Sequence, residues 1–168
     1  MTYGSRAAFI EYHESRGREI PGTWDNDYIN AALLVASEWI DNIYGARFSG
    51  QKTGGFDQVR EWPRLNAYAD VPPTPHLFPD DEIPDRIVYA SYEAAWRQAT
   101  TPDSLQVDYT PGKYKSVSID GALSVNYAQF SQVADIQTQI GVVDSLLWPL
   151  LTGPSGIGSS LSGGTKRT

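Results

Sequence analysis

The sequence predicts a mainly α fold: a small helical bundle with a β-hairpin and an extended C-terminal arm. Apolar residues recur at helical spacing in four segments, whereas one stretch near residues 114–127 alternates between apolar and polar residues. The last residues are rich in Gly and Ser and cannot build a core. We therefore expect one helical domain over residues 1–152 and an arm over residues 153–168.

The first two predicted helices lie near the N-terminus. Ser5 suits the N-cap of a short helix that reaches about Arg16, because its hydroxyl can accept a bond from a free backbone N–H. The second helix should run from about Trp24 to Tyr44, where apolar residues line one side. We expect Thr23 to cap its start and Gly45 to end it in the left-handed conformation.

A long connection follows the second helix. Loops of this length in packed helical domains tend to be functional or disordered, and the aromatic and arginine residues here argue against disorder. Trp62 and Arg64 lie between two loop halves that otherwise lack apolar anchors. We predict that Trp62 holds the loop by packing and that Arg64 pairs with a carboxylate or with carbonyls. The proline-rich run 71–75 must be extended.

The remaining elements follow from capping and periodicity. Pro84 and Asp85 suit the first turn of a third helix that reaches about Gln98, with a face of small residues. Residues 117–127 alternate around Asp120-Gly121, a pair that favours a hairpin turn. A last helix should run from about Ala134 to Leu147, where Pro149 stops it.

An ordered series of short pieces resembles a known family of proteins. The pieces are Ala31 to Ala36 with Trp39-Ile40-Asp41, Gly45 to Gln51, Trp62-Pro63-Arg64, Ile83-Pro84 with Ile87, Ala90, Glu93 and Ala94, Val117 to Tyr127, and Val142 to Leu147 with Pro149 to Leu151. In these the chain resembles head-to-tail adaptors of tailed bacteriophages, also called head completion or connector proteins. Some members of that family carry a label as DnaT-like single-stranded DNA-binding proteins.

The resemblance implies a virion structural protein of the neck, made in the host cytoplasm. Identical subunits, usually twelve, would form a ring on the portal protein and connect the DNA-filled head to the next tail component. Genomic DNA would pass through the lumen without specific binding. The alternative is a single-stranded DNA-binding protein of phage DNA metabolism.

The net charge of −7 bears on both interpretations. Nucleic-acid binders usually present a basic stripe, whereas this chain scatters its Lys and Arg among a majority of Asp and Glu. An acidic ring lets DNA slide, which favours the adaptor. The charge also predicts that single-stranded DNA is not bound tightly, because such binding needs aromatic platforms lined by cations.

The sequence predicts a protein that is not an enzyme and has no cofactor or metal. It has no Cys, which excludes thiol catalysis and disulfides. His13 and His76 fall in different elements, and each is expected at the surface or its boundary. The acidic run Asp80-Asp81-Glu82 is explained by solvation and by the dipole of the following helix. No apolar run is long enough to span a membrane, so no membrane partner is expected.

Aromatic and arginine residues are enriched at the centres of protein interfaces, and the chain has five Trp and ten Tyr. Within the arm, apolar residues would anchor it and basic residues would mark its tip. The candidate partner-interface residues are Trp62, Arg64, Tyr92, Trp96, Trp148, Ile157, Leu161, Lys166 and Arg167.

Overall fold

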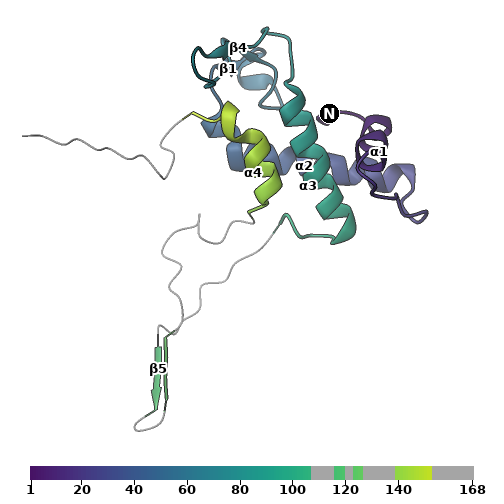
Figure 1. The fold of residues 1–168 in the computed structure, drawn as a ribbon, viewed down its shortest axis with the longest axis vertical. Coiled ribbons are helices and arrows are strands. Elements are labelled where there is room, and N and C mark those ends of the chain that lie inside the picture. Colours follow the sequence, from purple (N-terminus) through teal and green to yellow (C-terminus); the bar gives the residue numbers. More distant parts are fainter. Residues whose placement is uncertain (107–115, 120–122, 127–138, 153–168) are drawn as a thin grey trace, which may run out of the picture.

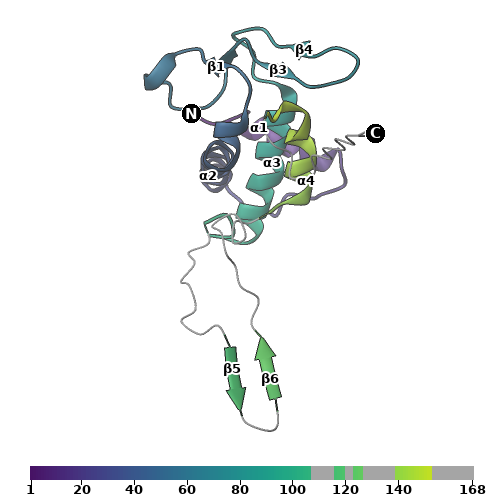
Figure 2. The same cartoon turned by 90° about the vertical axis from the view of Figure 1, so that its left-hand side faces the viewer.

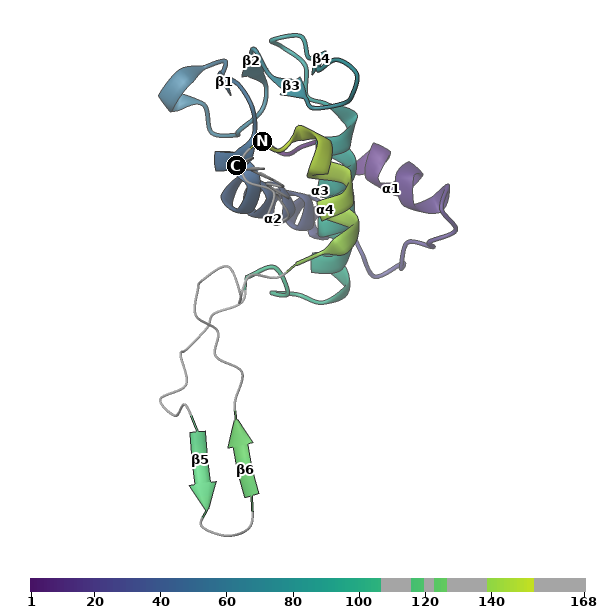
Figure 3. The same cartoon turned by 60° about the vertical axis from the view of Figure 1, so that its left-hand side comes forward.

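The computed structural model describes residues 1–106, 116–119, 123–126 and 139–152 (Figure 1). It confirms the predicted mainly α fold. The α-helices of the described residues are α1 (Arg6–Glu14), α2 (Asn26–Tyr44), α3 (Asp85–Thr100) and α4 (Gly141–Leu147). Helix α3 packs most extensively on α2 and next on α4, and α1 and α4 lie on opposite sides of α3 (Figures 1 and 3). No described helix has the length and apolarity needed to cross a bilayer.

The starts of α1 and α2 are set by side-chain caps. The Ser5 hydroxyl accepts a hydrogen bond from the Ala8 N–H at 3.3 Å, as predicted for α1. Helix α2 begins two residues later than predicted, because the Asp25 carboxylate accepts from the Tyr28 N–H at 2.8 Å and Thr23 is not the cap. A carboxylate also interacts favourably with the positive end of the helix dipole, which stabilises this cap.

The prediction for Gly45 was wrong. Its φ is −52°, a right-handed value, and the chain continues into a 3-10 helix, η1 (Gly45–Arg47). The residue is needed for space instead, because a Cβ there would lie 2.8 Å from Cγ of Glu61. Gly45 thus allows the long connection to pack against the end of α2.

Helix α3 has the small-residue face that the sequence predicts. Ala90, Ala94 and Ala95 are fully buried, so the neighbouring helices approach closely there. Helix α4 begins at Gly141 after the N-cap Ile140, so the predicted start at Ala134 was wrong for the described residues 139–140. The predicted residues 134–138 lie outside the described ranges.

The connection between α2 and α3 forms a second layer at one end of the helices (Figure 2). It contains two small antiparallel pairs: β1 (Gln51–Lys52) with β2 (Arg64–Leu65), and β3 (Tyr68–Ala69) with β4 (His76–Leu77). A short 3-10 helix, η2 (Gly55–Asp57), forms the tip of the first pair. After α4, the 3-10 helix η4 (Trp148–Leu150) brings the Pro149 carbonyl to the Asp70 N–H at 3.0 Å.

Trp62 and Arg64 hold this connection in place, as predicted. The Trp62 ring is 1% exposed and packs edge-on against Phe48 and Phe78, at centroid distances of 5.6 and 5.9 Å. Arg64 is buried, donates to the Ser49 carbonyl at 2.8 Å and pairs with the Glu61 carboxylate at 2.6 Å. The Trp62 ring and the Arg64 guanidinium therefore both help to order the loop.

The predicted hairpin is present as two antiparallel strands, β5 (Ser116–Ile119) and β6 (Leu123–Asn126). Their register pairs Val117 with Val125 and Ile119 with Leu123. The arm at 153–168 lies outside the described residues. The proposed boundary at residue 152 therefore stays a prediction.

Candidate functional site

The structure buries three of the predicted interface residues. Trp62 and Arg64 lie inside the connection, and Tyr92 is 2% exposed because α1 covers it. The Tyr92 hydroxyl accepts a hydrogen bond from the Ser5 N–H at 3.2 Å, and its ring meets the Phe9 ring edge-on at 5.9 Å. These side chains support the fold and are not available on the surface of the monomer.

The other predicted interface residues fall into two groups. Trp96 is partly buried on α3, and Trp148 is 60% exposed in η4. Ile157, Leu161, Lys166 and Arg167 belong to the arm and lie outside the described residues.

The outer side of α3 carries a stripe of one cationic and two aromatic side chains at helical spacing. Arg86 and Tyr89 are three residues apart and Trp96 follows two turns later, so all three project from the same side of the helix. Arg86 is exposed, and Tyr89 is 37% exposed. Helices α1 and α4 flank α3 on either side (Figure 1). Arg86 contacts α4 through a hydrogen bond to the Leu146 carbonyl, and Tyr89 contacts α1 through the Tyr12 ring.

Helix α1 adds a second row to the stripe. The Tyr12 ring stacks on the Tyr89 ring, with centroids 5.1 Å apart and planes 30° from parallel. Arg16 extends back over Tyr12, so that its Cζ lies 3.4 Å from the ring centroid, within the range of a cation–π contact. The Tyr12 ring is buried under this contact, whereas Arg16 and Tyr89 are exposed, and Arg16 Cζ lies 6.0 Å from the Tyr89 ring centroid.

A second arginine lies over the next ring. Arg18 Cζ is 5.5 Å from the centre of the Trp96 ring. The rings of Trp24 and Trp96 meet edge-on, with centroids 5.1 Å apart. Arg18 also pairs with the buried Glu93 carboxylate at 2.7 Å. Its charge is thereby neutralised, so Arg18 orders this part of the surface more than it attracts anions.

Glu93 also binds α1. The Tyr12 hydroxyl donates to the Glu93 carboxylate at 3.1 Å. Burial, and then the negative charge of Glu93, raise the pKa of Tyr12 to about 12, so the phenol stays protonated and remains a donor at neutral pH. The stacked rings are therefore held by a charged hydrogen-bond network beneath them.

His13 lies at the centre of this network and is fully buried, so its predicted surface location was wrong. Its Nε2 lies 3.2 Å from the Tyr92 carbonyl, which can only accept, and so Nε2 carries the proton. Nδ1 is then the acceptor for Arg18 Nη1 at 3.3 Å. Burial lowers the pKa of His13 to about 4, so the ring is neutral and positions Arg18.

We call this surface the arginine–aromatic face; its residues are Tyr12, Arg16, Arg18, Arg86, Tyr89 and Trp96. Among the described residues, Arg16 and Arg86 make no ion pair within 4 Å, and neither does the nearby exposed Arg97. Flat rings offer stacking partners for planar groups, and unpaired guanidinium groups attract anions. The face therefore suits a ligand that combines planar groups with negative charge.

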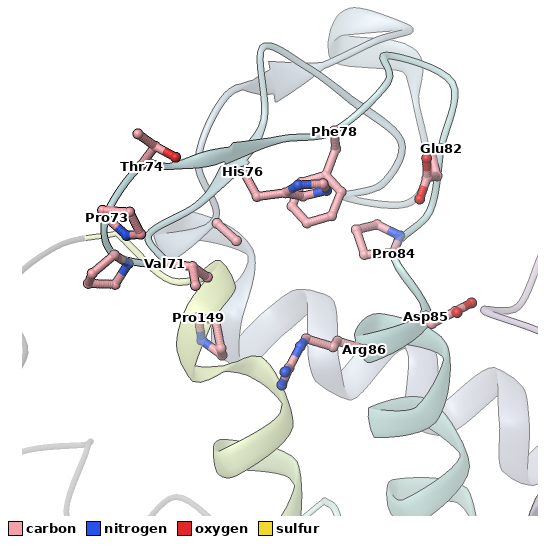
Figure 4. A pocket seen from close by; sticks show the side chains of 12 residues that line it. Val71, Pro73, Thr74, His76, Phe78, Glu82, Pro84, Asp85, Arg86 and Pro149 are labelled. Carbon is pink, nitrogen blue, oxygen red and sulfur yellow. The ribbon is translucent and has the colours of Figure 1, made fainter.

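A groove opens beside Arg86, between the β3–β4 pair and the ends of α3 and α4 (Figure 4). Its volume is about 520 Å³. His76 and Phe78 lie on one side, with ring centroids 4.9 Å apart at nearly a right angle. Most of the remaining lining is apolar: Ala69, Val71, Pro72, Pro73, Pro84 and Pro149.

Within the described ranges, no three His, Cys, Asp or Glu residues come together in a way that could hold a metal ion. In the acidic run before α3, the Asp80 carboxylate accepts from the Asn66 N–H at 3.0 Å. Asp80 thus helps to order the connection.

Comparison with known proteins gives one family. A family model described as "Putative DnaT-like ssDNA binding protein" matches residues 2–168. No curated protein and no solved structure matches the chain. The match corrects the head-to-tail adaptor interpretation, together with its virion and connector functions, and agrees with the alternative given beside it. The sequence alone favours the adaptor interpretation, because no basic stripe is visible in it.

Proposed function

We propose, because the chain belongs to the family of putative DnaT-like single-stranded DNA-binding proteins, that it binds single-stranded DNA on the arginine–aromatic face. The supporting observation is the exposed Arg16 guanidinium, which covers the buried Tyr12 ring, next to the partly exposed Tyr89 that stacks on Tyr12. Proteins that bind single strands combine cationic groups along the backbone with aromatic rings on which bases stack. The face provides both, and it does so without an acidic partner for Arg16 or Arg86 among the described residues.

The division of roles follows from exposure. Tyr89, at the surface of the stack, provides a ring edge and part of a face to a base. Arg16 and Arg86 lie near it, one at the end of α1 and one at the start of α3, where their guanidinium groups can bind successive phosphates. Arg18 is paired with Glu93 and acts by holding Trp96.

The net charge of −7 limits the affinity. Repulsion between the acidic surface and the phosphates opposes binding, so the dissociation constant should exceed about 1 μM at physiological salt. Three unpaired arginines, Arg16, Arg86 and Arg97, would neutralise about three phosphates, which gives a slope of log K against log salt of about −2 for a single strand.

The proposed activity is binding without catalysis. Assembly of identical subunits stays a prediction. Several faces side by side would raise the apparent affinity for a long strand without any new contact.

The test is fluorescence anisotropy with a labelled thymidine oligonucleotide, titrated at several salt concentrations between 20 and 150 mM. The same sequence as duplex DNA is the control, because paired bases cannot stack on protein rings. We expect weaker binding of the duplex and the slope given above. Absence of binding to the single strand at 20 mM salt would refute the proposal.

A further inference from the structure

We propose that the groove beside Arg86 receives one nucleobase of the bound strand, between the His76 and Phe78 rings on one side and the Arg86 guanidinium on the other. This inference rests on the proposed function and assigns a base-binding subsite to it. The groove and the arginine–aromatic face share Arg86, which lines the groove and also begins the outer stripe of α3.

The geometry of the walls suits a flat ligand. Figure 4 shows the His76 and Phe78 rings on the β4 side of the groove and Arg86 and Pro149 on the opposite side. Phe78 is held from behind by the buried Trp62 at 5.9 Å, and His76 is exposed at the opening. Arg86 is fixed by a hydrogen bond from Nη1 to the Leu146 carbonyl at 3.3 Å. Both walls are thus ordered before a ligand arrives.

The lining distinguishes a base from a phosphate. Four prolines form much of the lining, and their rigid rings need no ordering on binding. Glu82 and Asp85 also line the groove, and their carboxylates repel a phosphate. A neutral base avoids this repulsion, while the Thr74 hydroxyl and His76 can bind its polar edge. The carboxylates therefore favour a neutral base over a phosphate between the two walls.

The size fits the same ligand. A volume of about 520 Å³ falls within the roughly 300–1,000 Å³ of typical small-molecule sites, enough for a base with its sugar. The groove is also close to the stack on the face, because Arg86 and Tyr89 are separated by about 4.5 Å along the axis of α3. A strand stacked on Tyr89 can therefore place a neighbouring base in the groove.

The experiment separates the base from the backbone. The protein is titrated with a labelled eight-residue thymidine strand and with the same backbone lacking all bases, at 20 mM salt and pH 7.5. We divide the dissociation constant of the strand without bases by that of the thymidine strand. This ratio measures what the bases contribute to binding. We compare wild type with three variants: His76→Ala, which removes one of the two rings of the β4 wall, Thr74→Trp, which is designed to fill the groove, and Leu77→Ala. Leu77 is the matched control, because it is the exposed neighbour of His76 in β4 and does not line the groove.

The expected result is a ratio about fivefold smaller in His76→Ala and in Thr74→Trp than in wild type, the effect of losing one stacked base. Leu77→Ala should keep the wild-type ratio. If wild type binds the thymidine strand but both groove variants keep its ratio, the groove holds no base and the proposed function stands. If wild type binds neither strand, the proposed function fails and the subsite with it.

Discussion

Arginine side chains have opposite surroundings in the long connection and on the arginine–aromatic face. In the connection, all three guanidinium nitrogens of Arg64 donate to protein acceptors, among them the carbonyls of Ser49 and Gly50 and the Glu61 carboxylate. Arg60 is equally occupied, with the Met1 carbonyl and the carboxylates of α2 as acceptors. On the face, Arg86 makes one protein hydrogen bond and is exposed.

The difference separates an arginine that folds the chain from one that can bind a ligand. A buried guanidinium must satisfy its donors within the protein, because unpaired buried charge is strongly destabilising. An exposed guanidinium on a ring keeps donors free for an anion and loses little flexibility on binding. Composition alone treats the two kinds alike, so a count of charges does not reveal the exposed arginines of the arginine–aromatic face.

The largest expected effect tests the folding role of the connection. Arg64→Met should lower the free energy of unfolding by about 3 to 5 kcal/mol, because Glu61 and the carbonyls of residues 48–50 lose their donor. Urea denaturation followed by circular dichroism measures this change. Arg47→Met is the matched control, since Arg47 is exposed and close in sequence, and should change stability by less than about 0.5 kcal/mol. Equal losses of unfolding free energy in both variants would show that the buried Arg64 matters no more to the fold than the exposed Arg47.

Much of the fold was predictable because helix formation is local. Ser5 as a cap, Pro84 at the start of α3 and the small face of α3 all follow from short-range rules. The start of α2 was missed by two residues because Thr23 and Asp25 are both acceptable caps, and the carboxylate is the one used.

The arginine–aromatic face was not predictable in the same way. Arg16 and Tyr89 are far apart in sequence and come together only because α1 docks across α3. Local patterns do not encode that docking. One signal was present for His13: it follows the buried Phe9 by four residues, which places both on the inner side of α1.

The second prediction concerns the stability that the buried, neutral His13 gives the fold. The folded pKa of His13, about 4, lies below its ordinary value of 6.5, so the unfolded chain takes up a proton first as pH falls. Its contribution to stability is fully present above pH 6.5 and is lost between pH 6.5 and 4, by about 3 kcal/mol. Unfolding by urea at a series of pH values measures this loss.

The matched variant for this measurement is His13→Gln. Its amide can still donate to the Tyr92 carbonyl, and it does not titrate. The titratable and charged groups around His13 are Tyr12 of α1, Tyr92 and Glu93 of α3, and Arg16 and Arg18 beyond α1, and they remain in the variant. Between pH 6.5 and 4, the free energy of unfolding should therefore fall by about 3 kcal/mol less in His13→Gln than in wild type. An identical pH profile in both proteins would assign the loss to other groups.

The smallest expected effect tests the binding role of the open arginines. Arg16→Ala removes the guanidinium above Tyr12 and one phosphate contact, so binding of a single strand at 50 mM salt should weaken by about 1 kcal/mol, or about fivefold. The slope of log K against log salt should change from about −2 to about −1.3, because one contact contributes about 0.7 for a single strand. Arg47→Ala, an exposed arginine in η1 away from the face, should leave both values unchanged. Arg16→Ala should lower stability by about 1 kcal/mol, because it loses the contact with the Tyr12 ring and the hydrogen bond to the Tyr12 carbonyl, and Arg47→Ala by less than about 0.5 kcal/mol. Circular dichroism checks that both variants are folded under the binding conditions. If Arg16→Ala and Arg47→Ala weaken binding equally, the strand responds to net charge alone, and the stack of Arg16, Tyr12 and Tyr89 is not the site.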